Sequence, residues 1–111
     1  MAALIAQYRA LMQEKPVVAM AALYAYESRV PAIARTKAEG LEKHYATDAT
    51  TRRYFTVHTT ADVHHAQVWR ELIERQLAAD PTCEAAALDA AERAAKALWL
   101  ALDGIERERL N

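Results

Sequence analysis

Two histidines and one aspartate in the middle of the chain have the spacing of metal ligands on one helix face. His58, Asp62 and His65 stand at positions i, i+4 and i+7 of the segment YFTVHTTADVHHAQVW. At about 100° per residue of an α-helix they fall within an arc of about 60°, and His64 lies about 120° away from them. Two imidazoles and one carboxylate suit divalent iron, manganese or zinc. The pattern predicts a metal site, and a buried hydrogen-bond network of the same residues is the alternative.

A further carboxylate falls on the apolar stripe of the helix expected before this segment. Glu27 lies between Leu23 and Val30 on that stripe, with Ala34 one turn further along. An isolated charge among buried apolar side chains is too costly, so such a carboxylate is paired, protonated or bound to a metal. We expect Glu27 to join the metal ligands, and a second carboxylate favours iron or manganese over structural zinc. In the network alternative, Glu27 caps one of the histidines.

The elements that must position these side chains are predicted to be long helices. The 111 residues are 53% hydrophobic and include only two glycines and three prolines, a composition that argues against a sheet. Apolar residues recur at helical spacing in four segments, at about residues 2–13, 16–43, 51–79 and 81–103 or beyond. We therefore expect an all-α fold, an antiparallel bundle of about four helices that forms a single domain over residues 1–111.

Prolines and polar residues mark the expected helix starts. Pro16 and Pro81 suit the first turn of a helix, where a missing N–H costs nothing, and residues 47–50 offer N-cap side chains. Pro31 instead falls inside the second segment, where it cannot donate to the carbonyl of Glu27. Because helical periodicity continues on both sides of Pro31, we predict a kinked helix there and not a helix end.

Charge and cysteine content limit the function classes. A net charge of −1 gives no attraction to nucleic acid or to an anionic membrane surface. The single Cys83 forms no intrachain disulfide and fits a reducing compartment. The start of the chain has no basic leader with a cleavage site, and the apolar run 17–26 is about half of the ~20 residues that a membrane span requires. We expect a soluble cytoplasmic protein.

Three segments together resemble the haem-oxygenase-like helical superfamily. They are ALYAYESRVPAIARTKAEGLEKHY, YFTVHTTADVHHAQVW and ALWLALDGI, and the resemblance covers nearly the whole chain. It is closest to the branch that contains the chlamydial CADD proteins, the PqqC-like and TenA-like sequences and the non-haem di-iron oxidases. The motifs that carry it are a glutamate in a YAYES-type helix and H-x-x-x-D-x-x-H on the next helix.

The resemblance implies a non-haem iron-dependent oxidoreductase that activates O2 and acts on a small molecule. Glu27, His58, Asp62 and His65 would be the ligands of one or two iron ions, with manganese as the alternative metal. Lys37 matches a lysine that is proposed as the amino donor when CADD-like proteins make 4-aminobenzoate. By its position alone, Lys37 is a solvated lysine of the expected helix.

The chain departs from the superfamily in its length. Members are considerably longer, and their first half supplies further Glu and His ligands, whereas this chain begins at what looks like the fourth helix. It would hold half of the fold and half of the metal site, either as a fragment or as a half-length protein that completes itself by pairing. A catalytically inactive dimerising module and a PqqC-like oxidase of cofactor biosynthesis are the alternative functions.

Several apolar side chains lie on faces that a lone half-domain could not all cover. A large exposed apolar patch marks an interaction surface in a soluble protein. We therefore expect a homodimer with an isologous and mainly apolar interface. The residues concerned are Leu4, Ile5, Tyr8, Leu23, Trp69 and Trp99.

Overall fold

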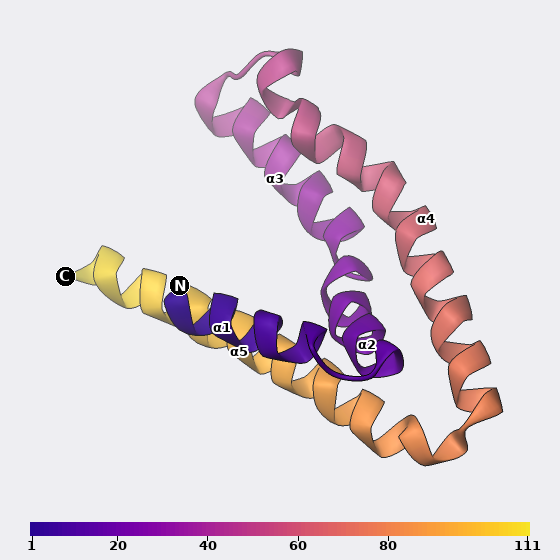
Figure 1. The fold of residues 1–111 in the computed structure, drawn as a ribbon. Helices are drawn as coiled ribbons and strands as arrows, with labels where there is room; N and C mark the ends of the chain where they lie inside the picture. Colours follow the sequence, from indigo (N-terminus) through magenta and orange to yellow (C-terminus); the bar gives the residue numbers. More distant parts are fainter. The chain divides into compact units, whose positions relative to one another are not determined.

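The computed structural model describes all 111 residues, and it contains helices and no strand (Figure 1). The all-α class is therefore confirmed. None of the helices combines the length and the hydropathy that crossing a bilayer requires. The elements are α1 (Ala2–Met12), α2 (Pro16–Glu27), α3 (Val30–Tyr45), α4 (Ala49–Ala79), a short 3₁₀ helix η1 (Pro81–Cys83) and α5 (Glu84–Leu110).

Aspartates fix the starts of two of these elements. The Thr51 backbone N–H donates to Asp48 Oδ1 at 2.8 Å, which caps the first turn of α4. The Thr51 side-chain hydroxyl, and after it this backbone hydrogen bond, lower the pKa of the Asp48 carboxyl. The Thr82 N–H donates to Asp80 Oδ1 at 3.1 Å in the same way, at the start of η1. The polar loop and the Asp-Pro pair therefore mark helix starts as expected, and α4 begins at Ala49, two residues earlier than predicted.

The structure has two separate helices around Pro31 where we predicted one kinked helix, so this prediction is wrong. α2 ends at Glu27, residues 28 and 29 form a turn, and α3 begins at Val30 with Arg29 as its N-cap. Pro31 thus lies in the first turn of α3, where its missing N–H has no intrahelical partner to lose. The regular ladder resumes when the Ile33 N–H donates to the Arg29 carbonyl at 3.2 Å. Ending one helix and starting another avoids the clash of the Pro31 ring with the carbonyl of Glu27.

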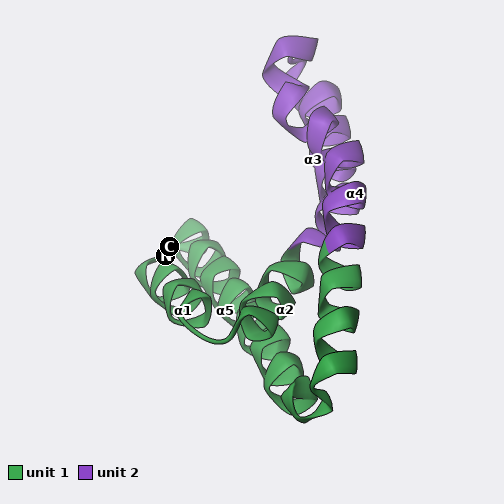
Figure 2. Ribbon diagram, turned by 45° about the vertical axis from the view of Figure 1, so that its right-hand side comes forward, with its two compact units in different colours: residues 1–26, 69–111 green, residues 27–68 purple.

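The chain divides into two compact units, and the prediction of a single domain stays a prediction (Figure 2). Unit 1 consists of residues 1–26 and 69–111. Its core is small, because α5 contributes alanines that let the other helices of this unit approach closely, and the only large side chain that is fully buried is Leu11. The buried residues of this core are Leu11, Val17, Val18, Ala21, Ala22, Ala87, Ala90 and Ala94.

Unit 2 consists of residues 27–68, so it holds α3 and the first part of α4 (Figure 2). The two helices run antiparallel because a loop of only three residues, 46–48, joins them. Ala46 closes α3 in the left-handed region, at φ 50° and ψ 37°, and its N–H donates to the Leu41 carbonyl. The Arg52 guanidinium donates to the Thr47 carbonyl and lies 3.7 Å from Glu42, which ties the loop to both helices.

Two substitutions, one of glycine by alanine and one of alanine by glycine, should both stabilise α3. Gly40 lies inside the helix without positive φ, and a Cβ added there meets no atom within 4 Å. Gly40→Ala should raise the free energy of unfolding by about 0.5–1 kcal/mol, because alanine loses less backbone entropy on folding. Ala46→Gly should also raise it, by about 1 kcal/mol, because glycine adopts positive φ without steric cost. Chemical denaturation measures both changes, and a loss of stability in either variant would contradict the backbone geometry described here.

Candidate metal centre

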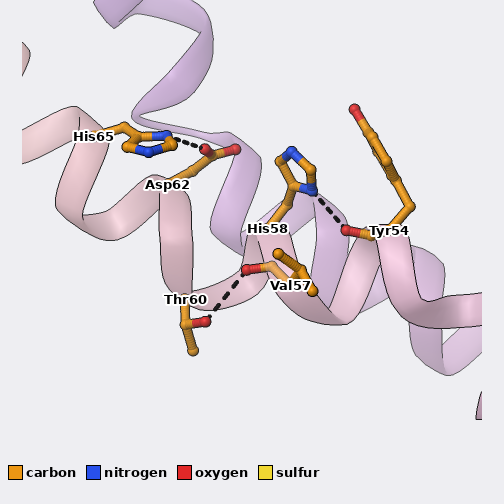
Figure 3. A network of polar contacts seen from close by, with 6 residues as sticks. All are labelled: Tyr54, Val57, His58, Thr60, Asp62 and His65. Atoms are coloured by element: carbon orange, nitrogen blue, oxygen red, sulfur yellow. Dashed lines mark hydrogen bonds and ion pairs between the residues drawn. The ribbon is translucent and has the colours of Figure 1, made fainter.

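His58, Asp62 and His65 project from the same side of α4, as their spacing predicts (Figure 3). Thr60 lies between them in sequence and points to the other side of the helix (Figure 3). All three belong to the part of α4 that lies in unit 2. The helical phase therefore brings two imidazoles and one carboxylate to one face.

The carboxylate of Asp62 is the only buried charged group of the chain, with a relative exposure of 5%. Its Oδ1 accepts a hydrogen bond from His65 Nδ1 at 2.8 Å (Figure 3). A buried carboxylate needs such compensation, because losing its hydration without a partner costs several kcal/mol. While Oδ1 accepts from His65, Oδ2 remains the oxygen that can bind a metal ion. An ion bound by both residues would replace the hydrogen bond between them, because the lone pair of His65 Nε2 points away from Asp62 while Nδ1 faces it.

The hydrogen bonds of the two histidines fix which ring nitrogen has a free lone pair. His58 Nδ1 lies 2.6 Å from the backbone carbonyl of Tyr54, and a carbonyl can only accept. Nδ1 of His58 is therefore protonated, and so is Nδ1 of His65 opposite the Asp62 carboxylate. In each neutral ring Nε2 then carries the lone pair. Metal-bound histidines in proteins show this arrangement, in which the second nitrogen donates to a carbonyl or a carboxylate.

Tyr54 is the one residue of this network that the sequence did not assign to the site. Its ring stacks on the His58 imidazole, with 4.2 Å between centroids and 29° between planes. Together with the hydrogen bond to the Tyr54 carbonyl, this contact holds the His58 ring in one orientation. The i, i+4 spacing of Tyr54 and His58 could have predicted this contact, because residues four apart are neighbours on a helix surface.

Glu27 approaches Asp62 and His65 from the end of α2. It is the last residue of α2, half-buried, directly before the turn that precedes Pro31. One potential ligand atom each of Glu27, Asp62 and His65 lies within 4.8 Å of the others. Ligand atoms that share one ion at about 2.1 Å lie about 3–4 Å apart, so small side-chain rotations would bring this set to binding distance. Glu27, Asp62 and His65 thus fit a divalent ion with a mixed carboxylate and imidazole preference.

The structure does not place all four expected ligands in this set. His58 is half-buried on the same face but is not part of the group of mutually close ligand atoms. Of the three residues of α4, Asp62 is buried, whereas the His65 side chain is 55% exposed.

Lys37 lies apart from the ligand group, on the exposed side of α3. Its Nζ is 5.7 Å from the centroid of the Phe55 ring, within the range of a cation–π contact. A shallow, almost entirely apolar depression of about 290 Å³ adjoins it, lined also by Leu41, His44 and Tyr45. The exposure of Lys37 agrees with the solvated lysine that its position alone indicates.

Several curated relatives carry the name 4-aminobenzoate synthase. The protein from Nitrosomonas europaea is 43% identical over 104 residues, which are 92% of this chain and 42% of the relative. The protein from Chlamydia trachomatis is 39% identical over 76% of this chain and 36% of the relative, and that from Chlamydia pneumoniae is 37% identical over 51% and 25%. The chain thus spans less than half the length of these relatives. No solved structure matches it significantly.

A family model described as an iron-containing redox enzyme covers most of the chain. It matches residues 1–99, which include all of α1 to α4 and the four residues expected to bind metal. This match and the named relatives confirm the resemblance that the sequence motifs indicated. The chain therefore belongs to the family of iron-containing redox enzymes.

Proposed function

We propose that this chain is a non-haem iron-dependent oxidoreductase, or the metal-bearing half of one, that takes part in forming 4-aminobenzoate. The observation that carries the proposal is the group of Glu27, Asp62 and His65 in unit 2. Family membership supports iron as the metal. The names of the relatives support the product, since they are called 4-aminobenzoate synthases.

The proposed ligands are Glu27, His58, Asp62 and His65. Glu27 and Asp62 contribute carboxylate oxygens. His58 contributes Nε2, whose lone pair its Nδ1 hydrogen bond leaves free, and His65 contributes a ring nitrogen once the metal replaces its hydrogen bond to Asp62. A set of two carboxylates and two imidazoles suits Fe²⁺ or Mn²⁺ and leaves coordination positions open. His58 would join by rotating its side chain, because it projects from the same face of α4 as Asp62 (Figure 3). A di-iron centre would need further ligands from outside this set.

Bound iron would supply the activation of O2, and the residues around it would control access and orientation. Before a metal ion binds, the hydrogen bond from His65 Nδ1 to Asp62 holds both side chains in place. Lys37 is the proposed catalytic residue, as the amine that provides the amino group of the product. Its exposed amine beside the Phe55 ring is accessible for reaction, and this assignment rests on the family resemblance.

We further propose that the chain works as a homodimer in the cytoplasm. The single Cys83 is a free thiol, which fits a reducing compartment. Large apolar side chains remain exposed. Two of the residues that we expected on a partner surface, Ile5 and Trp99, are among them. Leu4, Tyr8, Leu23 and Trp69 are half-buried within the chain.

Replacing both histidines of the proposed ligand set should abolish iron retention. His58→Ala together with His65→Ala removes both nitrogen ligands, and the remaining carboxylates bind Fe²⁺ too weakly to survive desalting. Iron is measured by mass spectrometry of the metal after anaerobic loading with Fe²⁺ and gel filtration. His64→Ala is the matched control, because His64 is an exposed neighbour that lies off the ligand face. Wild-type iron content in the double variant would exclude these ligands.

Lys37→Arg should stop product formation and leave iron binding unchanged. Arginine keeps the positive charge but cannot give up its nitrogen as a primary amine does. The iron-loaded chain is incubated with O2, a reductant and an aromatic carboxylic acid that supplies the ring, and 4-aminobenzoate is measured by liquid chromatography and mass spectrometry. Lys43→Arg, on the same helix and also exposed, is the control. Undiminished product from Lys37→Arg would remove Lys37 from the proposal.

A catalytically inactive dimerising module is the second candidate. One observation favours it, namely the exposure of the His65 side chain, which is 55% exposed. Iron content separates the two candidates, because a module that has lost the metal site retains no iron after loading even in the wild-type chain.

A further inference from the structure

The depression beside Lys37 lies within unit 2, between α3 and Phe55 of α4. Its volume of about 290 Å³ is at the lower end of the range of small-molecule sites, which suits a ligand with a single ring. Tyr45 and Phe55 contribute aromatic rings to its almost entirely apolar wall, so an aromatic ligand fits its chemistry. The residues that line it are Lys37, Gly40, Leu41, His44, Tyr45 and Phe55.

The charges at this depression favour an anion. Lys37 and His44 line it, and no carboxylate of the chain does. The two glutamates nearest to them on α3, Glu39 and Glu42, line a different depression. Lys37 contacts the ring of Phe55 and forms no ion pair with an acidic residue of the chain. An apolar wall with only basic groups at its edge is complementary to a ligand that has an apolar body and a negative charge.

Gly40 keeps the middle of the depression open. It lies inside α3 between Lys37 and His44, and a Cβ added there meets no atom within 4 Å. Its φ is not positive, so the backbone does not require glycine, although glycine destabilises the interior of a helix. A larger side chain at this position would extend into the space that a ligand needs.

We propose that this depression binds a one-ring aromatic carboxylate, the chemical class of 4-aminobenzoate, with ring carbon 4 towards Lys37 and the carboxylate towards His44. The inference rests on the proposed role of Lys37 as the amine donor. In 4-aminobenzoate the amino and carboxyl groups are at opposite ends of the ring, so a carboxylate held by Lys37 would turn carbon 4 away from its amine. The imidazole N–H of His44 is the donor that remains for the carboxylate.

The spacing of Lys37 and His44 fits a ligand of this length. The two side chains leave α3 within about 20° of one another, and their separation along the helix axis is about 10.5 Å. A benzoate extends about 5 Å from ring carbon 4 to its carboxylate oxygens, and a contact of about 3 Å at each end brings the length to about 11 Å. A single ring therefore bridges the two residues, whereas an acid with two rings in line would be too long.

The test measures binding of 4-aminobenzoate to the whole, metal-free chain by ligand-observed NMR titration. The wild-type chain should bind it with a Kd of about 0.1–1 mM, as expected for a small ligand in a shallow site. Gly40→Leu should weaken binding at least about 10-fold, because leucine fills the depression while it favours the helix. Gly104→Leu is the matched control, because Gly104 also lies inside a helix, in unit 1, where an added Cβ meets no atom within 4 Å. It should bind like the wild type, and far-UV circular dichroism checks that both variants remain helical.

Aniline, which has the ring and the amine but no carboxylate, tests the orientation of the ligand. The wild-type chain should bind 4-aminobenzoate about 10-fold more tightly than aniline, and His44→Leu should bind the two alike. His64→Leu, at an exposed histidine of α4 outside the depression, should keep the preference. A preference that disappears in Lys37→Met and persists in His44→Leu would reverse the orientation and refute the role of His44.

The binding assay requires no iron, so it separates this inference from the proposed function. A wild-type chain that does not bind 4-aminobenzoate at about 5 mM, or Gly40→Leu with wild-type affinity, would overturn the site. Binding with the expected pattern of variants, by a chain that retains no iron and forms no product, would refute the iron enzyme and leave the site supported. Product formation that Gly40→Leu leaves undiminished would do the opposite.

Discussion

A carboxylate that is withdrawn from water must be compensated by hydrogen bonds, by opposite charge or by a metal ion, and Asp62 imposes this requirement on unit 2. The requirement explains why His65 turns its Nδ1 towards Asp62 even though most of the imidazole is exposed. It also gives a physical reason for Glu27 to come close, since a cation shared by both carboxylates would remove their mutual repulsion. Three features bring Glu27, Asp62 and His65 together. They are the break between α2 and α3, the antiparallel pairing of α3 with α4, and the shared face of α4.

What the sequence could predict here depended on local geometry. The spacing of four and three residues placed His58, Asp62 and His65 on one face, because the helical period applies to any unbroken stretch of α4. Capping side chains located the start of α4 to within two residues and the start of η1 at the predicted residue. Asp48 and Asp80 do so because each accepts from backbone N–H groups two or three residues further along the chain. Family motifs then added iron as the expected metal, which spacing alone left open between several divalent ions.

What the sequence could not predict depended on competition between similar local choices or on tertiary contacts. A proline inside a helical pattern can kink one helix or separate two, and the phase of the apolar residues is almost the same in both cases. The two-residue turn at residues 28 and 29 therefore left no distinct signal in the periodicity. The exposure of His65 likewise depends on what packs over the α4 face, and no helical wheel contains that information.

The alanines at the centre of unit 1 have a thermodynamic consequence. Ala87, Ala90 and Ala94 are almost completely buried, yet each methyl group removes little apolar surface from water. The heat capacity change of unfolding scales with the apolar area that becomes exposed. A core built from methyl groups therefore gives this unit a small heat capacity change and a broad, shallow dependence of stability on temperature. Its resistance to denaturant should for the same reason fall gradually with concentration, because the slope of that dependence also follows the newly exposed area.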